Sequence, residues 1–336
     1  MREDRILLAH GSGGTMMKEL IEDLFVAEFG DESLKRLDDA AALDFPGGRL
    51  AFSTDTYVVS PLFFPGGDIG RLAVCGTVND VATSGAQPLY LSVGFVLEEG
   101  VAVEDLRRIL ISMRDAAREA GVRIVTGDTK VVERGHGDGV YLNTAGVGVI
   151  PDGVDLSGSH CQPGDAVLLS GTLGDHGIAV VSTREGLSFS TDILSDAAPL
   201  NRLVADVLEA APNARCFRDP TRGGLASTLN ELAGASGVSI TVEEALVPVR
   251  EQVRGACEML GYDVFQVANE GKMVAVVPDD EADAALAAMK DAPYGADAAI
   301  VGKVADSPAG RVYVRTSFGV TRIMDMLVGE QLPRIC

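Results

Sequence analysis

Residues 218–226 read Arg218-Asp219-Pro220-Thr221-Arg222-Gly223-Gly224-Leu225-Ala226, a short carboxylate and a glycine pair at the start of an apolar period. The apolar residues that follow recur at helical spacing through Ala233, which predicts a glycine-containing loop that opens a helix. The free backbone N–H groups of a helix N-terminus bind anions, and Arg222 can pair with the same anion. The stretch favours a phosphate-binding loop, with close helix packing as the alternative role of the two glycines.

Short carboxylates set among small residues recur in four other places. They lie in Asp38-Asp39-Ala40-Ala41, Ser53-Thr54-Asp55, Asn79-Asp80-Val81-Ala82 and Thr126-Gly127-Asp128-Thr129, each at an expected strand end or loop. Such a loop lets carboxylate and backbone approach a hydrated Mg²⁺, which prefers hard oxygen ligands together with nucleotide phosphates. Any one of these aspartates alone is better read as a turn residue or a helix N-cap, but their recurrence predicts one shared site.

A second glycine-rich loop, His10-Gly11-Ser12-Gly13-Gly14, precedes apolar residues at helical spacing over residues 16–25. That order suits phosphate binding as well as it suits a plain helix start. The loop lacks the last glycine of GxGxxG, and Lys18 lacks the preceding glycine of a P-loop, so Rossmann and P-loop proteins are disfavoured. His10 and His136 lie in glycine-rich loops where either could face a ligand.

The chain of 336 residues exceeds the usual size of one hydrophobic core, so two domains are expected. Residues 151–159 are turn-forming throughout and place the boundary near residue 153. We therefore predict an N-terminal domain over residues 1–152, a C-terminal domain over 153–328 and a mobile tail over 329–336. Strands are expected at residues 50–60, 92–97, 123–126, 140–150, 166–170, 238–242, 264–277 and 298–304. Helices are expected at residues 103–120, 176–183, 200–210, 225–235, 251–260 and 281–290, which makes both halves α/β.

Composition narrows the class of partner. The 28 Lys+Arg against 49 Asp+Glu give a formal charge of −21, which disfavours nucleic acid and membrane surfaces as partners. The five cysteines form no CxxC pair and fit neither a disulfide framework nor a zinc ribbon, so a reducing cytoplasm is the expected compartment. No apolar run is long enough for a signal peptide or a membrane span.

The chain ends on a cysteine, in Pro333-Arg334-Ile335-Cys336. A terminal thiol on an unpaired tail stiffened by proline can move between sites, whereas a core cysteine cannot. Taken without context, a frayed end is the simpler interpretation.

These motifs together resemble a superfamily of ATP-binding proteins that includes aminoimidazole ribonucleotide synthetase, selenophosphate synthetase, thiamine-phosphate kinase and the HypE hydrogenase maturation factors. The resemblance is specific to the HypE family in residues 125–132, 218–226 and 267–272 and in the terminal Pro333-Arg334-Ile335-Cys336. It implies a two-domain fold of the aminoimidazole ribonucleotide synthetase type. The N-terminal sheet would pair with that of a second subunit in a homodimer barrel, a C-terminal α/β domain would pack beside it, and ATP would bind between the domains.

The resemblance also implies an activity, that of an ATP-dependent carbamoyl dehydratase. The carbamoyltransferase HypF would load Cys336, ATP with Mg²⁺ would phosphorylate the amide oxygen, and the sulfur would end as a thiocyanate. The HypC–HypD complex would take the cyanide for the iron of a [NiFe] hydrogenase.

The same resemblance assigns roles to residues of this chain. Besides Cys336 as carrier, the catalytic residues implied are Glu270 as the base and Lys130 as the group that stabilises charge on the activated oxygen. The implied metal ligands are Asp38, Asp39, Asp80 and Asp219. The implied nucleotide contacts are Gly13, Gly14, Asp55, Gly127, Asp128, Thr129, Arg222 and Gly223. Which aspartates touch Mg²⁺ directly stays open.

Two other functions compete with this one. Another enzyme of the superfamily is the first alternative, although residues 11–18 contain no cysteine that could handle selenide. A nucleotide-sensing scaffold that only docks partners is the second. It would need neither Lys130, Glu270 nor Cys336.

Overall fold

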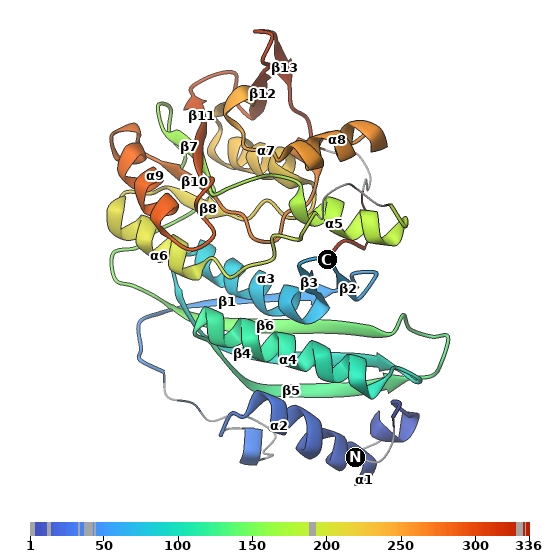
Figure 1. The fold of residues 1–336 in the computed structure, drawn as a ribbon. Helices are drawn as coiled ribbons and strands as arrows, with labels where there is room; N and C mark the ends of the chain where they lie inside the picture. The colour runs from blue at the N-terminus through green and yellow to red at the C-terminus, as the bar shows by residue number, and fades with distance from the viewer. Residues whose placement is uncertain are drawn as a thin grey trace.

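The computed structural model describes residues 4–11, 15–32, 34–36, 43, 45–187, 193–326, 332 and 334–336. Strands and helices alternate through both halves, and each half builds its own large sheet, which confirms the mixed α/β class (Figure 1). The short helical segments are η1 (Leu8–Gly11), α1 (Thr15–Leu20), the π-helical η2 (Ile21–Val26), α2 (Ala27–Phe29), η3 (Leu34–Arg36), η4 (Glu244–Leu246), η5 (Val264–Gln266) and η6 (Asp279–Glu281). The predicted helix over residues 16–25 is thus helical, with a π segment in its second half.

The N-terminal sheet has four strands in the order β1-β6-β4-β5. Their bounds are β1 (Arg49–Tyr57), β4 (Gln87–Glu98), β5 (Arg123–Val132) and β6 (Val140–Ile150), and a small hairpin joins β2 (Phe63–Phe64) to β3 (Gly67–Asp68). Helices α3 (Ile69–Thr83) and α4 (Val103–Ala120) cover one face of this sheet. Along β1 the residues alternate between that covered face and an open one, where Leu50 is 55% and Phe52 67% exposed.

The two covering helices differ in how far the sequence reveals them. Helix α4 has one apolar stripe and ends at Gly121, whose N–H donates to the Ala117 and Arg118 carbonyls in the left-handed conformation that glycine favours. The sequence-based interpretation found α4 and missed α3. Most of α3 is buried, because it lies between the N-terminal sheet and the C-terminal half, so it shows no polar stripe.

The C-terminal sheet has seven strands in the order β13-β12-β9-β11-β7-β10-β8. Their bounds are β7 (Ala166–Leu169), β8 (Cys216–Arg218), β9 (Ser239–Glu243), β10 (Val274–Val277), β11 (Ala299–Ala305), β12 (Arg311–Arg315) and β13 (Thr321–Ile323). One face packs on α6 (Asn201–Ala210) and α9 (Ala282–Asp291), and the other on α7 (Gly224–Ser236). Helices α5 (Asp175–Arg184) and α8 (Glu251–Leu260) share the apolar core of α3 and α4 instead.

Two expectations about local structure are wrong. Residues 264–277 do not form one strand, because η5 and an irregular loop occupy residues 264–273 and only β10 is extended. The aspartates also do not all sit at strand ends or in loops. Asp55 and Asp128 lie inside β1 and β5, and Asp80 lies in the last turn of α3.

Candidate active site

Helix α3 joins the two halves through Asn79, whose side chain is 1% exposed. Its amide nitrogen donates to the carbonyls of Ala198 (3.0 Å) and Glu270 (3.2 Å), and its oxygen accepts from the N–H of Leu200 (2.7 Å). A buried amide with three such partners fixes the relative position of the segments it binds. The next residue, Asp80, is thereby placed against the C-terminal half.

Four carboxylates meet at this junction: Asp55 from β1, Asp80 from α3, Asp219 from the loop after β8, and Glu270 from the loop before β10. Burial raises the pKa of Asp80, although a hydrogen bond from Ser53 Oγ (2.9 Å) acts against it. Burial and then the charge of Asp80 raise the pKa of Asp219 to about 7. The carboxylates therefore resist ionising together.

Glu270 is the most deeply placed of the four, at 4% exposure. Its backbone N–H donates to Asp196 Oδ1 (3.1 Å), while its own Oε1 has no hydrogen-bond partner among the described residues. Burial, followed by the charges of Asp219 and Asp196, raises the pKa of Glu270 well above its usual range. A buried carboxyl of this kind is a strong proton acceptor once it is ionised.

The end of the chain enters the same junction, close to α5 and the β2–β3 hairpin (Figure 1). The N–H of Val58 donates to the main-chain oxygen of Cys336 (3.1 Å), and the N–H of Ser60 donates to the carbonyl of Arg334 (3.2 Å). Ile335 is 2% exposed and belongs to the core that contains α3 and α5. The expectation of an unpaired end is therefore wrong for residues 334–336.

The Cys336 thiol lies next to Glu270. Burial, then the charge of Glu270, raises the pKa of this thiol, and Arg222 lowers it by a smaller amount. In this docked position the sulfur is accordingly a thiol and not a thiolate. The sequence-predicted residues Cys336, Glu270, Asp55, Asp80, Asp219 and Arg222 thus come together at one junction.

The glycine pair after Asp219 lies at the N-terminus of α7, in left-handed conformations. A Cβ on Gly224 would come within 2.6 Å of the carbonyl oxygens of Phe265 and Val267, so the loop packs closely against the segment that leads to Glu270. A Cβ on Gly223 would meet the Ser227 hydroxyl at 2.1 Å. Close packing thus explains why a glycine is needed at position 224. The same packing places the start of α7 next to the carboxylates.

Lys130 and its neighbours lie elsewhere. They belong to β5, the edge strand farthest from β1, and Lys130 Nζ pairs with Asp128 Oδ1 at 2.7 Å on the open face of the sheet. The two side chains are 62% and 67% exposed, while Thr129 points into the covered side and is buried. A Cβ on Gly127 would lie 2.5 Å from the Val93 carbonyl, so this glycine is required by the strand pairing. Within one chain these residues do not join Glu270.

Four predicted residues, Gly13, Gly14, Asp38 and Asp39, lie outside the described residues. Of the two histidines, His10 is buried and its Nδ1 accepts from the N–H of Leu7 (2.9 Å). His136 is exposed in the turn after β5. Neither contacts the junction of carboxylates in the part of the chain that the structure describes.

The donor set suits a divalent cation held jointly with phosphate oxygens. Among the described residues, no three His, Cys, Asp or Glu side chains are arranged to hold a metal ion by themselves. Asp80 is nonetheless close enough for its charge to raise the pKa of Asp219. Arg218, whose charge acts against that rise, also pairs with Glu231 (2.7 Å). Mg²⁺ typically takes one or two carboxylates plus phosphate oxygens and water, which fits this pair.

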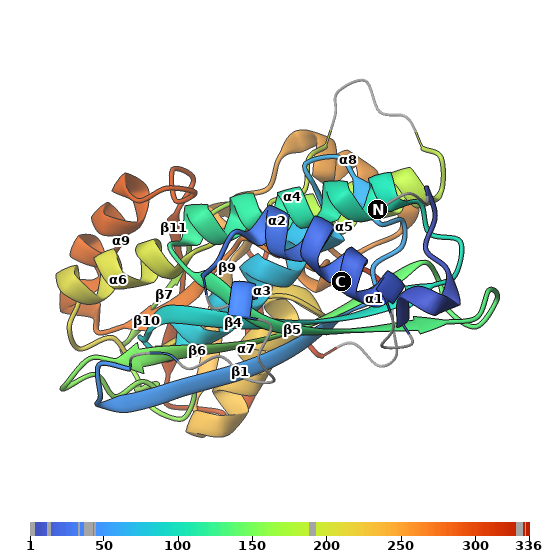
Figure 2. The same ribbon diagram turned by 90° about the horizontal axis from the view of Figure 1, so that it is seen from below.

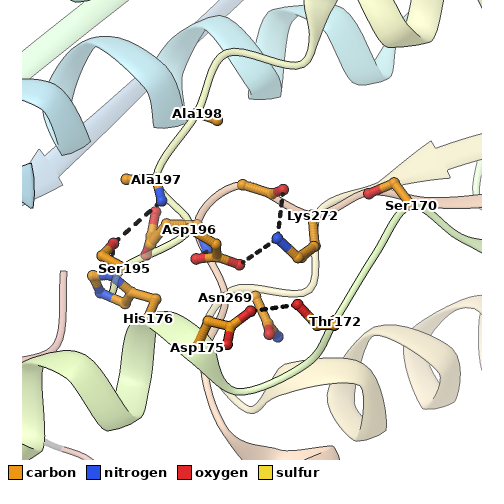
Figure 3. A network of polar contacts seen from close by, with 12 residues as sticks. Ser170, Thr172, Asp175, His176, Ser195, Asp196, Ala197, Ala198, Asn269 and Lys272 are labelled. Atoms are coloured by element: carbon orange, nitrogen blue, oxygen red, sulfur yellow. Dashed lines mark hydrogen bonds and ion pairs between the residues drawn. The ribbon is translucent and has the colours of Figure 1, made fainter. Parts of the chain in front are cut away.

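Sequence reasoning missed a buried polar network beside Glu270 (Figure 3). Lys272 Nζ pairs with Asp196 Oδ2 at 3.2 Å, with side chains 8% and 3% exposed. Asn269 accepts from the N–H of Gly174 (2.7 Å) and donates to the Pro220 carbonyl (2.8 Å). His176, expected at a helix start, is the second residue of α5, and its ring also contacts the chain end. The sequence signal that could have indicated this network is the position of the polar residues Asn269 and Lys272 on either side of Glu270.

No helix in the described part of the chain is long and apolar enough to cross a membrane. Two domain families match most of the sequence. AIR synthase related protein, N-terminal domain, covers residues 37–150, and AIR synthase related protein, C-terminal domain, covers residues 162–315.

Among similar proteins, the carbamoyl dehydratase HypE of Azotobacter vinelandii is 55% identical over 336 residues, which is 100% of this chain and 98% of that protein. A crystal structure of the hydrogenase maturation protein HypE in complex with ATP superimposes with a TM-score of 0.95 at 52% identity, over 98% of this chain and 99% of the other. The structure of a HypE–HypF complex matches with a TM-score of 0.81 at 50% identity, over 92% and 99% of the two chains.

Proposed function

Because the chain belongs to the HypE family of carbamoyl dehydratases, as its motifs predicted, we propose that it dehydrates an S-carbamoyl group on its own Cys336 to a thiocyanate at the expense of ATP. The observation that carries the proposal is the position of the chain end. The thiol of Cys336 lies beside the buried Glu270 carboxyl, whose Oε1 has no hydrogen-bond partner in the part of the chain that the structure describes, next to three further carboxylates. A superfamily member that phosphorylates a free substrate has no need of a docked terminal cysteine.

The chemistry requires an amide oxygen to leave and a nitrogen to lose two protons. Transfer of the ATP γ-phosphoryl group to the carbamoyl oxygen turns that oxygen into phosphate, which departs as the C–O bond breaks. Glu270 takes a proton from the nitrogen as the carbon–nitrogen triple bond forms, and the second proton leaves to phosphate or solvent. The raised pKa of Glu270 suits this role, since a carboxylate of higher pKa is a stronger proton acceptor once it is ionised.

The same position argues that Cys336 is loaded elsewhere. In the docked state its pKa is raised by burial and by Glu270, and a thiol attacks an acyl donor far less readily than a thiolate. Loading by a carbamoyltransferase of the HypF type therefore requires the end of the chain to leave the junction. The proposal thus keeps the mobile tail expected from the sequence and adds the docked position of residues 334–336 as one of its two states.

Asp80 and Asp219 are our proposed Mg²⁺ ligands, with Asp38 and Asp39 as further candidates. When bound, the metal would neutralise charge on the nucleotide phosphates. Asp55, Arg222 and Gly223 lie at the same junction and are proposed to orient the nucleotide between the two halves, with Gly13 and Gly14 as further candidates.

We also propose a homodimer in which the open faces of two N-terminal sheets meet. Leu50 and Phe52 are exposed on that face at 55% and 67%, and contiguous exposed apolar side chains mark interaction surfaces. Asp128 and Lys130 lie on the same face, with Gly127 and Thr129 beside them. If Lys130 stabilises charge during the reaction, it therefore acts across this interface and not on its own chain's Cys336.

The remaining assignments follow from the proposed chemistry. A HypF carbamoyltransferase would supply the carbamoyl group, and a HypC–HypD complex would accept the cyanide for the iron of a [NiFe] hydrogenase. All five cysteines are free thiols in this structure, which suits a reducing cytoplasm as the compartment.

Mass spectrometry of the C-terminal peptide tests the proposal directly. The protein is incubated with a HypF carbamoyltransferase, carbamoyl phosphate and ATP, with and without Mg²⁺. We expect a carbamoyl adduct on Cys336 that loses the mass of one water in the presence of Mg²⁺. A peptide that remains unmodified, or a dehydrated adduct on another cysteine, would overturn the proposal.

A further inference from the structure

The carbonyl of the penultimate residue, Ile335, is bound by a buried histidine. His176 lies in the first turn of α5 and is fully buried. Its Nε2 lies 2.8 Å from the Ile335 oxygen. Its Nδ1 lies 2.8 Å from Ser195 Oγ, and Figure 3 shows His176 together with Ser195. A carbonyl only accepts, so Nε2 carries the hydrogen. Because burial lowers the pKa of His176, the ring is neutral and Nδ1 accepts from the Ser195 hydroxyl.

Ser195 is in turn oriented by the backbone. The N–H of Ala197 donates to its Oγ (3.2 Å), which leaves the hydroxyl hydrogen free for His176. Residues 195–197 are also fixed from the N-terminal half, because the N–H of Ser195 donates to the Pro65 carbonyl (2.8 Å) and Arg71 Nε donates to the Ala197 carbonyl (2.7 Å). The hydrogen bonds from Ser195 to His176 and on to Ile335 thus start from a segment that is itself held in place.

Asp196, which lies between Ser195 and Ala197, binds the backbone of the proposed base, Glu270. Asp196 Oδ1 accepts from the backbone N–H of Glu270 (3.1 Å), and Asp196 Oδ2 pairs with the buried Lys272 (3.2 Å). The two segments approach so closely that a Cβ on Gly271 would lie 1.8 Å from the Asp196 carbonyl oxygen. Residues 195–197 therefore contact both the group that holds the chain end and the backbone of Glu270.

We propose that His176 and Ser195 are positioning residues that hold the chain end in its inner position and fix the Cys336 sulfur relative to Glu270. The catalytic consequence rests on the proposed function, whereas the docking of the chain end does not. Since a displacement of about 1 Å in a reacting pair can cost on the order of a hundredfold in rate, holding both partners through one three-residue segment keeps their separation constant. Neither side chain touches the reacting atoms.

The docking is tested by the rate at which iodoacetamide alkylates Cys336, followed by mass spectrometry of the C-terminal peptide in the nucleotide-free protein. We expect His176→Leu and Ser195→Ala to raise that rate by about fivefold or more, as for the loss of one neutral hydrogen bond. His176→Gln keeps a terminal N–H for the Ile335 carbonyl and should restore part of the protection.

Ser182→Ala is the matched control. Ser182 is a buried serine of α5 whose hydroxyl donates within its own helix, to the Ala179 carbonyl (3.0 Å). It should leave the alkylation rate unchanged. If His176→Leu lowers the melting temperature strongly, the alkylation rate of Ser195→Ala decides the test, because that substitution removes only one oxygen atom. Wild-type alkylation rates in both variants would overturn the proposal.

A second readout separates this proposal from the proposed function. With ATP and a carbamoyl donor, Ser195→Ala should still accept the carbamoyl group but form thiocyanate at least about tenfold more slowly, with an unchanged KM for ATP. If the wild-type protein forms no thiocyanate, the proposed function fails while the alkylation result still decides the docking. If the variant shows wild-type kinetics, the positioning role fails while the proposed function stands.

Discussion

Replacing Asp219 by asparagine should stabilise the folded protein in the absence of divalent cations and weaken its binding of ATP with magnesium. The reason is the cost of ionising this carboxyl in the folded state. Its pKa is raised from 3.8 to about 7, by burial and then by the charge of Asp80. The folded state therefore binds the Asp219 proton more tightly than the unfolded state does.

The sign of the pH dependence follows from that difference. Below about pH 4 the carboxyl is protonated in both states and costs nothing; the penalty grows between pH 4 and pH 7 and is complete above pH 7. A difference of about 3 pKa units corresponds to about 4 kcal/mol at most. Because Asp219 is only half-buried and its neighbours remain after substitution, we expect Asp219→Asn to stabilise by about 2 kcal/mol at pH 8. For 336 residues that is a rise of about 3 °C in the melting temperature.

Thermal unfolding in the presence of EDTA at pH 8 and pH 5 measures the effect. The stabilisation at pH 5 should be about 40% of that at pH 8, and added Mg²⁺ with ATP should reverse the order of stability at pH 8. Asp297→Asn, the same change on an exposed loop side chain of the C-terminal half, should be neutral. No stabilisation by Asp219→Asn, or an equal one at both pH values, would refute the reasoning.

Three further substitutions test other parts of the site. Glu270→Gln should still accept the carbamoyl group yet form no thiocyanate in the mass-spectrometric assay, and dehydration at the normal rate would return Glu270 to a structural role. Cys336→Ala should abolish carbamoyl acceptance and, since only one partly buried sulfur is lost, lower stability by no more than about 1 kcal/mol. The control Cys257→Ala should keep acceptance, and a protein-bound thiocyanate in Cys336→Ala would disprove the carrier assignment. Phe52→Glu should convert a dimer to monomers in light scattering after size exclusion. Phe318→Glu, which changes an exposed phenylalanine in the turn between β12 and β13 of the other sheet, should not.

The fold was predictable where an element meets water along one side. Helix α4 has such a stripe, and its predicted bounds agree with the structure. Helix α3 does not, because both halves of the protein bury it, and a helix buried on all sides shows no 3.6-residue period. For residues 264–273 the sequence predicted a strand that the structure does not contain. Their apolar composition suggests a strand, but their polar groups bind α5 and the loop at Pro220 instead of a neighbouring strand.

The site divides along a similar line. Glu270 and Cys336 were identified through family motifs, and the structure places them side by side although 66 residues separate their numbers in the sequence. Nothing in the sequence near His176 indicates that its ring binds the Ile335 carbonyl, because that contact depends on the packing of α5 against the chain end. Lys130 illustrates the converse, since its motif predicted that it belongs to the site, whereas its side chain lies exposed on the open face of the N-terminal sheet. A sequence motif identifies residue types, whereas the distances between them arise from tertiary packing.

The acidity of the junction links the occupancy of the site to the state of its base. Asp219 and Asp80 both add to the raised pKa of Glu270, after burial. With these carboxylates ionised and uncompensated, the pKa of Glu270 is raised further and the side chain is harder to ionise. A divalent cation held by the proposed ligands Asp80 and Asp219 would offset their charge. The pKa of Glu270 would then fall toward the value that burial, Asp196 and Asp55 impose. Glu270 thus loses its proton most readily when the charges of the two aspartates are compensated. In the empty site the uncompensated charges disfavour its ionised form, which is the form that acts as a base.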